Sequence, residues 1–184
     1  AAIGYAEERE KNIELGIIRN HYVGRTFIEP TQQIRSLGVK LKHSINKTLI
    51  KNKSLILIDD SLVRGTTSVK IIKMLYEAGA KEVHMKIASP PIKYPDYYGV
   101  DTPNKKELLA SNFDLEGMRK FTNATTIQFL SIDGLYKSMG FNKRNSSYPQ
   151  FTDHCFTGDY PVKPLDALNE NFQKKQISYI SSKS

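Results

Sequence analysis

The sequence predicts an α/β fold built on a parallel sheet, because strand patterns alternate with helical patterns along its central part. Residues 55–58 form a short apolar run that ends at Asp59, residues 66–78 repeat apolar side chains at helical spacing, and residues 83–87 alternate apolar and polar side chains. Parallel strands joined by helices make right-handed crossovers, and ligands of such sheets bind at the carboxyl ends of the strands. We therefore expect the functional residues to follow the strand at residues 55–59.

The N-terminal part is predicted to hold short elements around a long polar loop. Residues 1–11 look like the end of a helix, and residues 15–18 like a short strand. Residues 19–36 are polar, contain Gly and Pro, and are typical of a functional loop. Residues 39–50 alternate basic and apolar side chains at near-helical spacing, which favours a solvated helix.

The middle of the chain carries the clearest pattern. The apolar run that ends at Asp59 predicts a buried strand at residues 55–59, and we place it at the centre of the sheet. The helix at residues 66–78 is expected to be capped by Thr66 or Thr67 and ended by Gly79.

Beyond the strand at residues 83–87, several prolines predict an irregular stretch. Short helices are expected at residues 105–110, 114–121 and 132–139, and a strand at residues 125–130. Residues 140–164 are predicted to form a long surface loop, and residues 166–180 a C-terminal helix.

Residues 59–68 place two acids, a glycine and several hydroxyl side chains between the strand and the helix. A bare pair of aspartates usually belongs to a surface turn, but here a Gly/Thr/Ser turn follows and leads into a helix N-terminus. The N–H groups, the hydroxyls and the helix end can bind a phosphate. The paired acids can bind ribose hydroxyls directly or through Mg²⁺. The segment thus indicates a site for a sugar phosphate.

This segment resembles the phosphoribosyl diphosphate (PRPP) motif of type I phosphoribosyltransferases, and within them it is most similar to the glutamine PRPP amidotransferases. Residues 19–28 are similar to that family's flexible catalytic loop. Shorter matches occur at residues 76–83, 88–92, 98–101 and 155–161. The resemblance implies a type I phosphoribosyltransferase-like parallel sheet flanked by helices and truncated at its N-terminal edge. It implies that residues 1–184 form a partial domain with a C-terminal extension, and that the N-terminal glutaminase domain and the pyrophosphate loop are absent.

The resemblance also implies a role for each residue of the motif. Asp59 and Asp60 would hold the ribose 2- and 3-hydroxyls and position Mg²⁺, next to Ser61. Gly65 would let the backbone approach the phosphate without a Cβ atom in the way. The residues expected to surround the 5-phosphate are Arg64, Gly65, Thr66, Thr67 and Ser68.

Tyr22 and Arg25 are the candidate catalytic residues of the flexible loop. By resemblance this loop closes over PRPP and excludes water while C1 of the ribose develops oxocarbenium character. His21 stands where the family is expected to have Arg, so it would be a weaker cation at neutral pH.

The family makes 5-phosphoribosylamine from PRPP and glutamine-derived ammonia, in the first step dedicated to purine (IMP) synthesis, and AMP and GMP inhibit it. The chain is therefore expected to be the transferase portion, acting as a homo-oligomer or with a separate glutaminase. The alternative is a non-catalytic fragment that binds PRPP or purine nucleotide monophosphates.

Composition limits the remaining function classes. The net charge is +8, with many basic groups in residues 40–53, but no RNA- or DNA-binding signature accompanies them. A solvated basic surface near an anionic substrate is favoured over a nucleic-acid-binding module. No apolar run approaches the roughly 18 residues of a membrane helix, and no charged-then-apolar leader pattern appears in its first residues. A single cysteine suits a reducing cytoplasm.

Cys155 invites a metal interpretation. Some family members hold an iron–sulfur cluster with four cysteines, and Cys155 stands at the position of the last one. Thr152 and Asp96 occupy two of the other ligand positions. Because four thiolates are normally required, we expect no iron–sulfur cluster and assign Cys155 a structural role.

Overall fold

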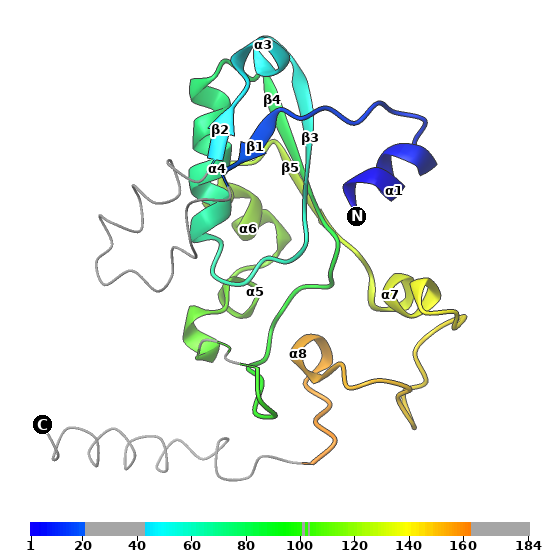
Figure 1. The fold of residues 1–184 in the computed structure, drawn as a ribbon. Coiled ribbons are helices and arrows are strands. Elements are labelled where there is room, and N and C mark those ends of the chain that lie inside the picture. The colour runs from blue at the N-terminus through cyan, green and yellow to red at the C-terminus, as the bar shows by residue number, and fades with distance from the viewer. Residues whose placement is uncertain (21–42, 101, 103, 163–184) are drawn as a thin grey trace, which may run out of the picture.

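A computed structural model describes residues 1–20, 43–100, 102 and 104–162 of the chain (Figure 1). Three parallel strands form the main sheet in the order β3 (Ser54–Asp59), β4 (Glu82–Ile87) and β5 (Thr126–Phe129). β1 (Ile17–Arg19) and β2 (His43–Ile45) pair antiparallel in a second, two-stranded sheet. The described helices are α1 (Ala2–Glu8), α3 (Lys47–Ile50), α4 (Thr66–Glu77), the 3-10 turn η2 (Lys105–Glu107), α5 (Leu109–Asn112), α6 (Leu115–Thr122), α7 (Ile132–Ser138) and α8 (His154–Thr157).

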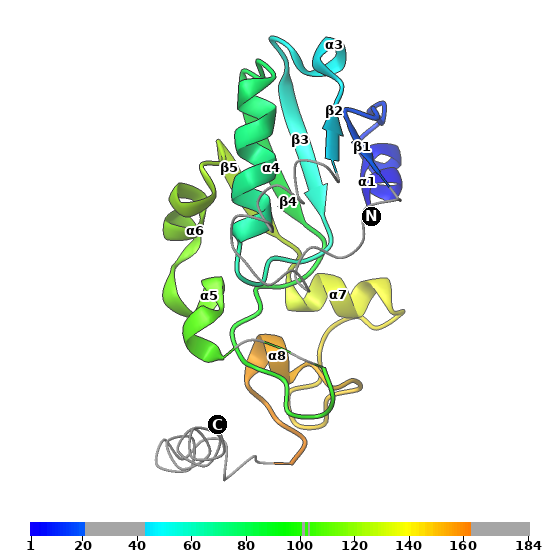
Figure 2. The same ribbon diagram turned by 60° about the vertical axis from the view of Figure 1, so that its left-hand side comes forward.

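The main sheet is wound in one direction. α4 connects β3 to β4, and α6 lies between β4 and β5 in the chain, so both crossovers step toward the same edge. Crossovers of one hand that step the same way place their helices on the same face of a sheet. α4 and α6 accordingly lie along one side of the sheet in Figures 1 and 2, and they contact each other. The predicted α/β class with a parallel sheet flanked by helices is confirmed.

The core lies between these helices and the sheet face that they cover. Val83, Met85 and Ile87 alternate with half-exposed residues along β4 and are buried, as the period-two pattern predicts. Ile72 and Leu75 of α4 pack onto the same cluster. Each of these side chains removes apolar surface from water, which is the main favourable contribution to folding.

The other face of the sheet is polar. On this face Nδ1 of His84 lies 2.9 Å from the hydroxyl of Thr126. Ile56 of β3, in register with His84, is 47% exposed. β3 is a strand as predicted, but it lies at the edge of the described sheet and none of its residues is buried. The prediction of a buried strand is wrong, and within the described residues β3 is not central either, because a short apolar run does not reveal which strands will flank it.

Two further predictions need correction. The described part of residues 39–50 forms β2 and then α3, and α3 begins after Asn46, whose side chain accepts N–H groups at 3.2 and 3.4 Å. Residues 140–164 contain α8 and the buried side chains of Asp153 and His154, so a surface loop describes only part of them. The C-terminal helix expected at residues 166–180 lies outside the described residues.

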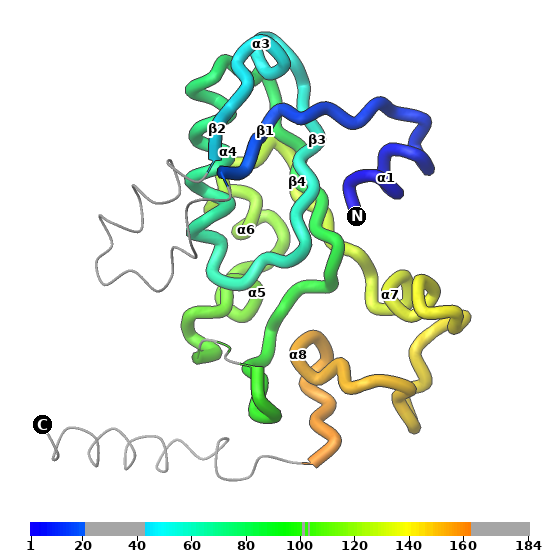
Figure 3. Tube along the Cα trace, in the orientation of Figure 1, coloured from blue at the N-terminus to red at the C-terminus, as the bar shows by residue number. Residues whose placement is uncertain are grey.

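α8 is fixed to the segment that follows β4. The N–H groups of Lys93 and Tyr94 donate to the carbonyl oxygen of Cys155 at 2.9 and 3.0 Å. Figure 3 shows this segment, in green, passing beside the orange turn of α8. In the described residues, no helix has the length and apolar character needed to span a lipid bilayer.

Candidate functional site

The predicted phosphate site begins where β3 ends, at Asp59. Its Oδ1 atom accepts the N–H of Asp60 at 3.0 Å, and the hydroxyl of Ser68 lies near enough to lower the pKa of its carboxyl group slightly. Ser68 belongs to the first turn of α4 and is buried. The carboxylate therefore lies near the N-terminal turn of α4, at the carboxyl end of the strand.

The second carboxylate has a different environment. Asp60 is exposed, and the hydroxyl of Ser61 donates to its Oδ1 atom at 3.2 Å. Asp59 is half-buried. The two neighbouring acids thus offer one ligand at the surface and one set back against the helix.

Burial raises the pKa of Asp59 above its ordinary value. The N–H of Asp60 lowers this pKa, the carboxylate of Asp60 raises it, and His43 and Ser68 lower it by smaller amounts. The net shift is upward, so the charged form of Asp59 is less stable here than in water. A bound cation would favour the charged form. Two carboxylates with an exposed oxygen set are a donor set that fits Mg²⁺.

The turn between the acids and α4 is held in place by contacts with the core and with α5. Leu62 is buried in the core, and the carbonyl of Val63 accepts the N–H of Leu109 at 2.9 Å. Gly65 has φ +75°, and a Cβ atom there would lie 2.9 Å from Cδ2 of Leu109 and 3.1 Å from Cε1 of Phe121. In this structure glycine is therefore required by the left-handed backbone and by packing against α5 and α6.

Gly65 is also the N-cap of α4, which corrects the prediction that Thr66 or Thr67 caps it. Because Gly65 has no side chain, no side-chain cap bonds the first-turn N–H groups. Those groups lack partners within a helix, and they carry the partial positive charge of the helix end. Thr66 and Thr67 are exposed on that turn, so an anion can reach both the N–H groups and the hydroxyls.

Arg64 has a protein partner in this structure. Its Nη2 atom lies 3.1 Å from Oε2 of Glu107 in η2, and both side chains are half-exposed. Exposed ion pairs contribute little to stability, so a phosphate can compete for Arg64 at low cost. Sequence reasoning missed Glu107, Leu109 and Phe121, because nothing in their local pattern indicates which turn they contact.

The remaining predicted residues are not all placed. Tyr22 and Arg25 lie outside the described residues. A cavity of about 380 Å³ lies beside α6 and β5, and one of about 570 Å³ is lined by residues 141–150. Neither of these two cavities is lined by a residue of the segment 59–68.

Known proteins are similar to this chain in sequence and in fold, although no protein-family model matches it. It is 58% identical over 183 residues to an amidophosphoribosyltransferase of Rhizobium etli, covering 99% of this chain and 37% of that protein. It is 51% identical to amidophosphoribosyltransferase 1 of Arabidopsis thaliana, a chloroplastic protein, covering 90% of this chain and 28% of the other.

A solved structure is also similar. It is the glutamine PRPP amidotransferase of Bacillus subtilis complexed with ADP and GMP, with a TM-score of 0.75 and 48% identity. The match covers 88% of this chain and 35% of that one. The chain thus spans about a third of the length of the relatives that it matches.

Proposed function

The chain is homologous to part of the amidophosphoribosyltransferases, and we propose that it forms their phosphoribosyl-transfer portion. The observation that carries this proposal is the meeting of Asp59, Asp60 and the uncapped N-terminus of α4 at the end of one strand. The proposed reaction of the complete enzyme is displacement of pyrophosphate from PRPP by glutamine-derived ammonia. It forms 5-phosphoribosylamine in the first committed step of purine synthesis.

In this proposal each part of PRPP has its own partner. The first-turn N–H groups of α4 and the hydroxyls of Thr66 and Thr67 bind the 5-phosphate. Asp59 and Asp60 accept hydrogen bonds from the ribose hydroxyls, and they would hold Mg²⁺. When bound, that ion supplies positive charge that offsets the charge of the phosphates.

Arg64 is proposed to leave Glu107 and bind the 5-phosphate when PRPP arrives. A guanidinium group bonds a phosphate with two parallel N–H groups, and charge-assisted bonds of this kind are stronger than neutral ones. Tyr22 and Arg25 are proposed as catalytic-loop residues on the strength of the resemblance alone. Their role is to exclude water while C1 of the ribose loses its leaving group.

A second candidate function is binding of purine monophosphates without chemistry. The Bacillus subtilis relative was solved with ADP and GMP, which supports nucleotide binding in this group of proteins. A nucleoside 5-monophosphate has the same ribose 5-phosphate end as PRPP, so residues 59–68 suit both ligands. AMP and GMP are therefore proposed as inhibitors that compete with PRPP.

The proposed setting rests on the single cysteine and on the resemblance, since one of the relatives is a chloroplastic protein. We infer a cytoplasmic location and a homo-oligomer, or association with a glutaminase domain that supplies the ammonia. The surplus of basic residues, with a net charge of +8, is proposed to attract anionic substrates rather than nucleic acid.

Calorimetry with PRPP, AMP and GMP, each with and without Mg²⁺, tests the binding proposal. Asp60→Asn and Thr66→Ala should each weaken binding about tenfold or more, since each removes a hydrogen bond to a charged or strongly polar group. Thr126→Ala, on the polar face of β5, is the matched control and should bind as the parent does. Unchanged binding in both site variants would show that residues 59–68 are not the ligand site.

Two further measurements separate the candidate functions. Pyrophosphate release with PRPP and ammonium chloride reports transfer, and nucleotide binding without any release favours the non-catalytic candidate. A nucleic-acid-binding module would lose affinity steeply as salt rises. A phosphate site should instead keep its preference for ribose 5-phosphates over inorganic phosphate.

A further inference from the structure

Three side chains that can bind a metal meet where α8 contacts the segment after β4. Nε2 of His154 lies 2.7 Å from Oδ2 of Asp96, and Sγ of Cys155 lies 3.9 Å from the same oxygen. The ligating atoms of the three residues all lie within 4.8 Å of one another. Asp96 is more than fifty positions from the other two in sequence, so folding alone brings the donors together.

The carboxylate of Asp96 is held in one orientation by its own loop. Its Oδ1 atom accepts the N–H of Tyr98 at 2.7 Å and the N–H of Val100 at 3.0 Å. The N–H of Asp96 donates to the hydroxyl of Thr102 at 2.6 Å. Oδ2 is therefore turned toward His154 and Cys155. Orienting contacts of this kind around a ligand are a usual feature of metal sites.

The imidazole of His154 is enclosed. Its side chain is 5% exposed and that of Asp96 is 7% exposed. The rings of Tyr98 and Tyr160 lie with their centroids 5.0 Å from the imidazole. These walls exclude bulk water from the side chains that would coordinate the ion.

The two ring nitrogens of His154 have different surroundings. Nδ1 of His154 is buried and has no hydrogen-bond partner among the described residues. Nε2, the other ring nitrogen, faces Oδ2 of Asp96, so it is the nitrogen that a metal between Asp96 and Cys155 would take.

We propose that Asp96, His154 and Cys155 form a site for one divalent cation of the zinc class. Carboxylate oxygen, imidazole nitrogen and thiolate sulfur are the donors that Zn²⁺ takes, at about 2.0–2.3 Å. The soft sulfur ligand disfavours Mg²⁺ and Ca²⁺. Three protein ligands leave the fourth tetrahedral position to water.

Metal binding at this site displaces a proton. The thiol of Cys155 gives up its proton as the Zn–S bond forms, and the proton is released to the solvent. The hydrogen bond between Asp96 and His154 is replaced by a bond from each residue to the metal. A dication bound by one carboxylate and one thiolate leaves the buried site without net charge, which limits the cost of burial.

The site would fasten α8 to the segment that follows β4. Among the described residues, the backbone contacts of Cys155 with Lys93 and Tyr94 already join these two parts. A metal bound by both parts stabilises the folded chain in proportion to the free metal concentration. The cation thus has a structural role, separate from the carboxylates at residues 59 and 60.

Cobalt is the probe for the ligand set. The full chain is stripped with a chelator and titrated with Co²⁺, whose visible and near-ultraviolet bands report tetrahedral geometry and thiolate coordination. The expected result is a thiolate-to-cobalt band that saturates at about one equivalent, as for a single site. His154→Gln and Asp96→Asn should weaken binding tenfold or more, because even loss of an orienting partner commonly costs that much. His84→Gln is the matched histidine control and should leave the titration unchanged.

Thiol reactivity gives a second readout that needs no variant. Cys155 is the only cysteine in the chain, so a thiol reagent reports on this residue alone. Zn²⁺ should slow its modification at least tenfold and raise the melting temperature, and excess Mg²⁺ should do neither. The proposal is overturned if Zn²⁺ leaves the modification rate unchanged, or if the cobalt spectrum lacks a thiolate band. An identical titration by a folded His154→Gln variant would overturn it as well.

Discussion

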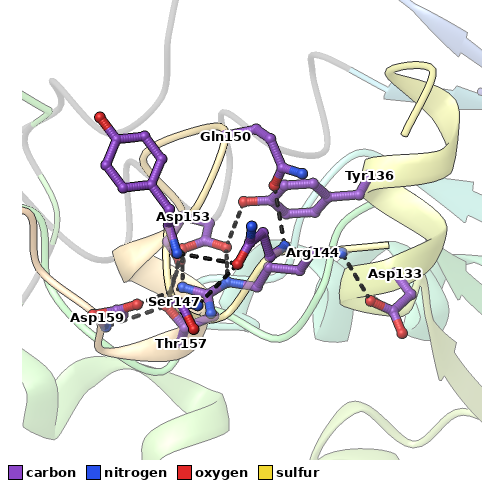
Figure 4. Close-up of polar contacts among 10 residues, drawn as sticks. Asp133, Tyr136, Arg144, Ser147, Gln150, Asp153, Thr157 and Asp159 are labelled. Carbon is purple, nitrogen blue, oxygen red and sulfur yellow. Dashed lines mark hydrogen bonds and ion pairs between the residues drawn. The ribbon is translucent and has the colours of Figure 1, made fainter. Parts of the chain in front are cut away.

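Arg144 and Asp153 form an ion pair inside the C-terminal part of the described chain, with Nε of Arg144 2.5 Å from Oδ2 of Asp153 (Figure 4). A second bond joins Nη2 of the arginine to Oδ1 at 3.1 Å. The hydroxyl of Tyr136, in α7, donates to Oδ2 at 2.9 Å. Because Asp153 is only 4% exposed, these bonds supply the solvation that water gives a carboxylate at the surface. They connect α7, the following loop and the start of α8.

Removing the arginine should therefore destabilise the protein strongly. Arg144→Met leaves the carboxylate of Asp153 buried without its counter-ion, a change that typically costs about 3–5 kcal/mol. Urea unfolding of the variant measures the loss. Lys143→Met, at the exposed neighbouring position, is the control and should change the free energy of unfolding by less than about 0.5 kcal/mol. Equal effects in the two variants would contradict this account.

The ion pair between Arg144 and Asp153 also predicts how the free energy of unfolding depends on pH. Burial raises the pKa of Asp153, but the bonds from Arg144 and Tyr136 outweigh burial and hold its pKa below the ordinary value. A carboxyl group with a lowered folded-state pKa contributes stability above its unfolded pKa of about 3.9, and loses it as pH falls through the folded value. Unfolding free energies measured from about pH 6 down to pH 2 should thus fall less steeply for Asp153→Asn than for the parent. Parallel curves would count against the assignment.

Asp59 should behave in the opposite way. Burial raises the pKa of Asp59, so ionisation of this group costs stability once pH rises through its folded-state pKa. At pH 7 the isosteric Asp59→Asn should raise the melting temperature while reducing affinity for PRPP about tenfold or more. Thermal melts at pH 3 and pH 7 give the check, since the stabilisation should be present at pH 7 and shrink at pH 3. A variant that melts lower at pH 7 would refute the prediction.

Gly65 offers a test of local packing. Gly65→Ala adds a Cβ atom at φ +75° and within 3.1 Å of both Leu109 and Phe121, so it should cost about 1–3 kcal/mol. Gly140→Ala is the matched control, because it has φ +87° and no neighbouring atom within 4 Å. It should cost about 1 kcal/mol from backbone strain alone. Chemical denaturation of both variants measures the two losses of unfolding free energy, and their difference is the contribution of packing at Gly65. A smaller loss for Gly65→Ala than for Gly140→Ala would contradict this account.

No iron–sulfur cluster should form in this chain. Cys155 is its only cysteine, and such clusters normally require four thiolates. Anaerobic purification followed by iron and acid-labile sulfide analysis gives the measurement. Stoichiometric amounts of both within a single chain would disprove the prediction.

The sequence predicts the strands and helices around residues 55–130 well, because their periodicity is local. It does not predict how the elements meet. The apolar run of β3 looks buried, yet Ile56 is half-exposed because β3 lies at the edge of the described sheet. The polar residues before α8 look like a loop, yet Asp153 is buried because Arg144 and Tyr136 reach it from earlier in the chain.

At the candidate site, the motif predicts that Asp59, Asp60 and the first turn of α4 form one site, and this stays a prediction. It does not predict that Glu107 pairs with Arg64, nor that Leu109 packs against Gly65. These contacts join residues about forty positions apart, and only the fold brings them together. For the same reason, the local sequence pattern does not predict the contact between Asp96 and His154.

β3 has one more consequence, for the behaviour of the chain in concentrated solution. Within the described residues it pairs with β4 alone, so the N–H and C=O groups along its outer side are unused by the sheet. Another extended chain can pair with such a strand through its unpaired backbone groups. An exposed apolar side chain such as Ile56 adds to this tendency to associate. Self-association should accordingly begin at β3, and a lysine at position 56 should suppress it without touching the phosphate site.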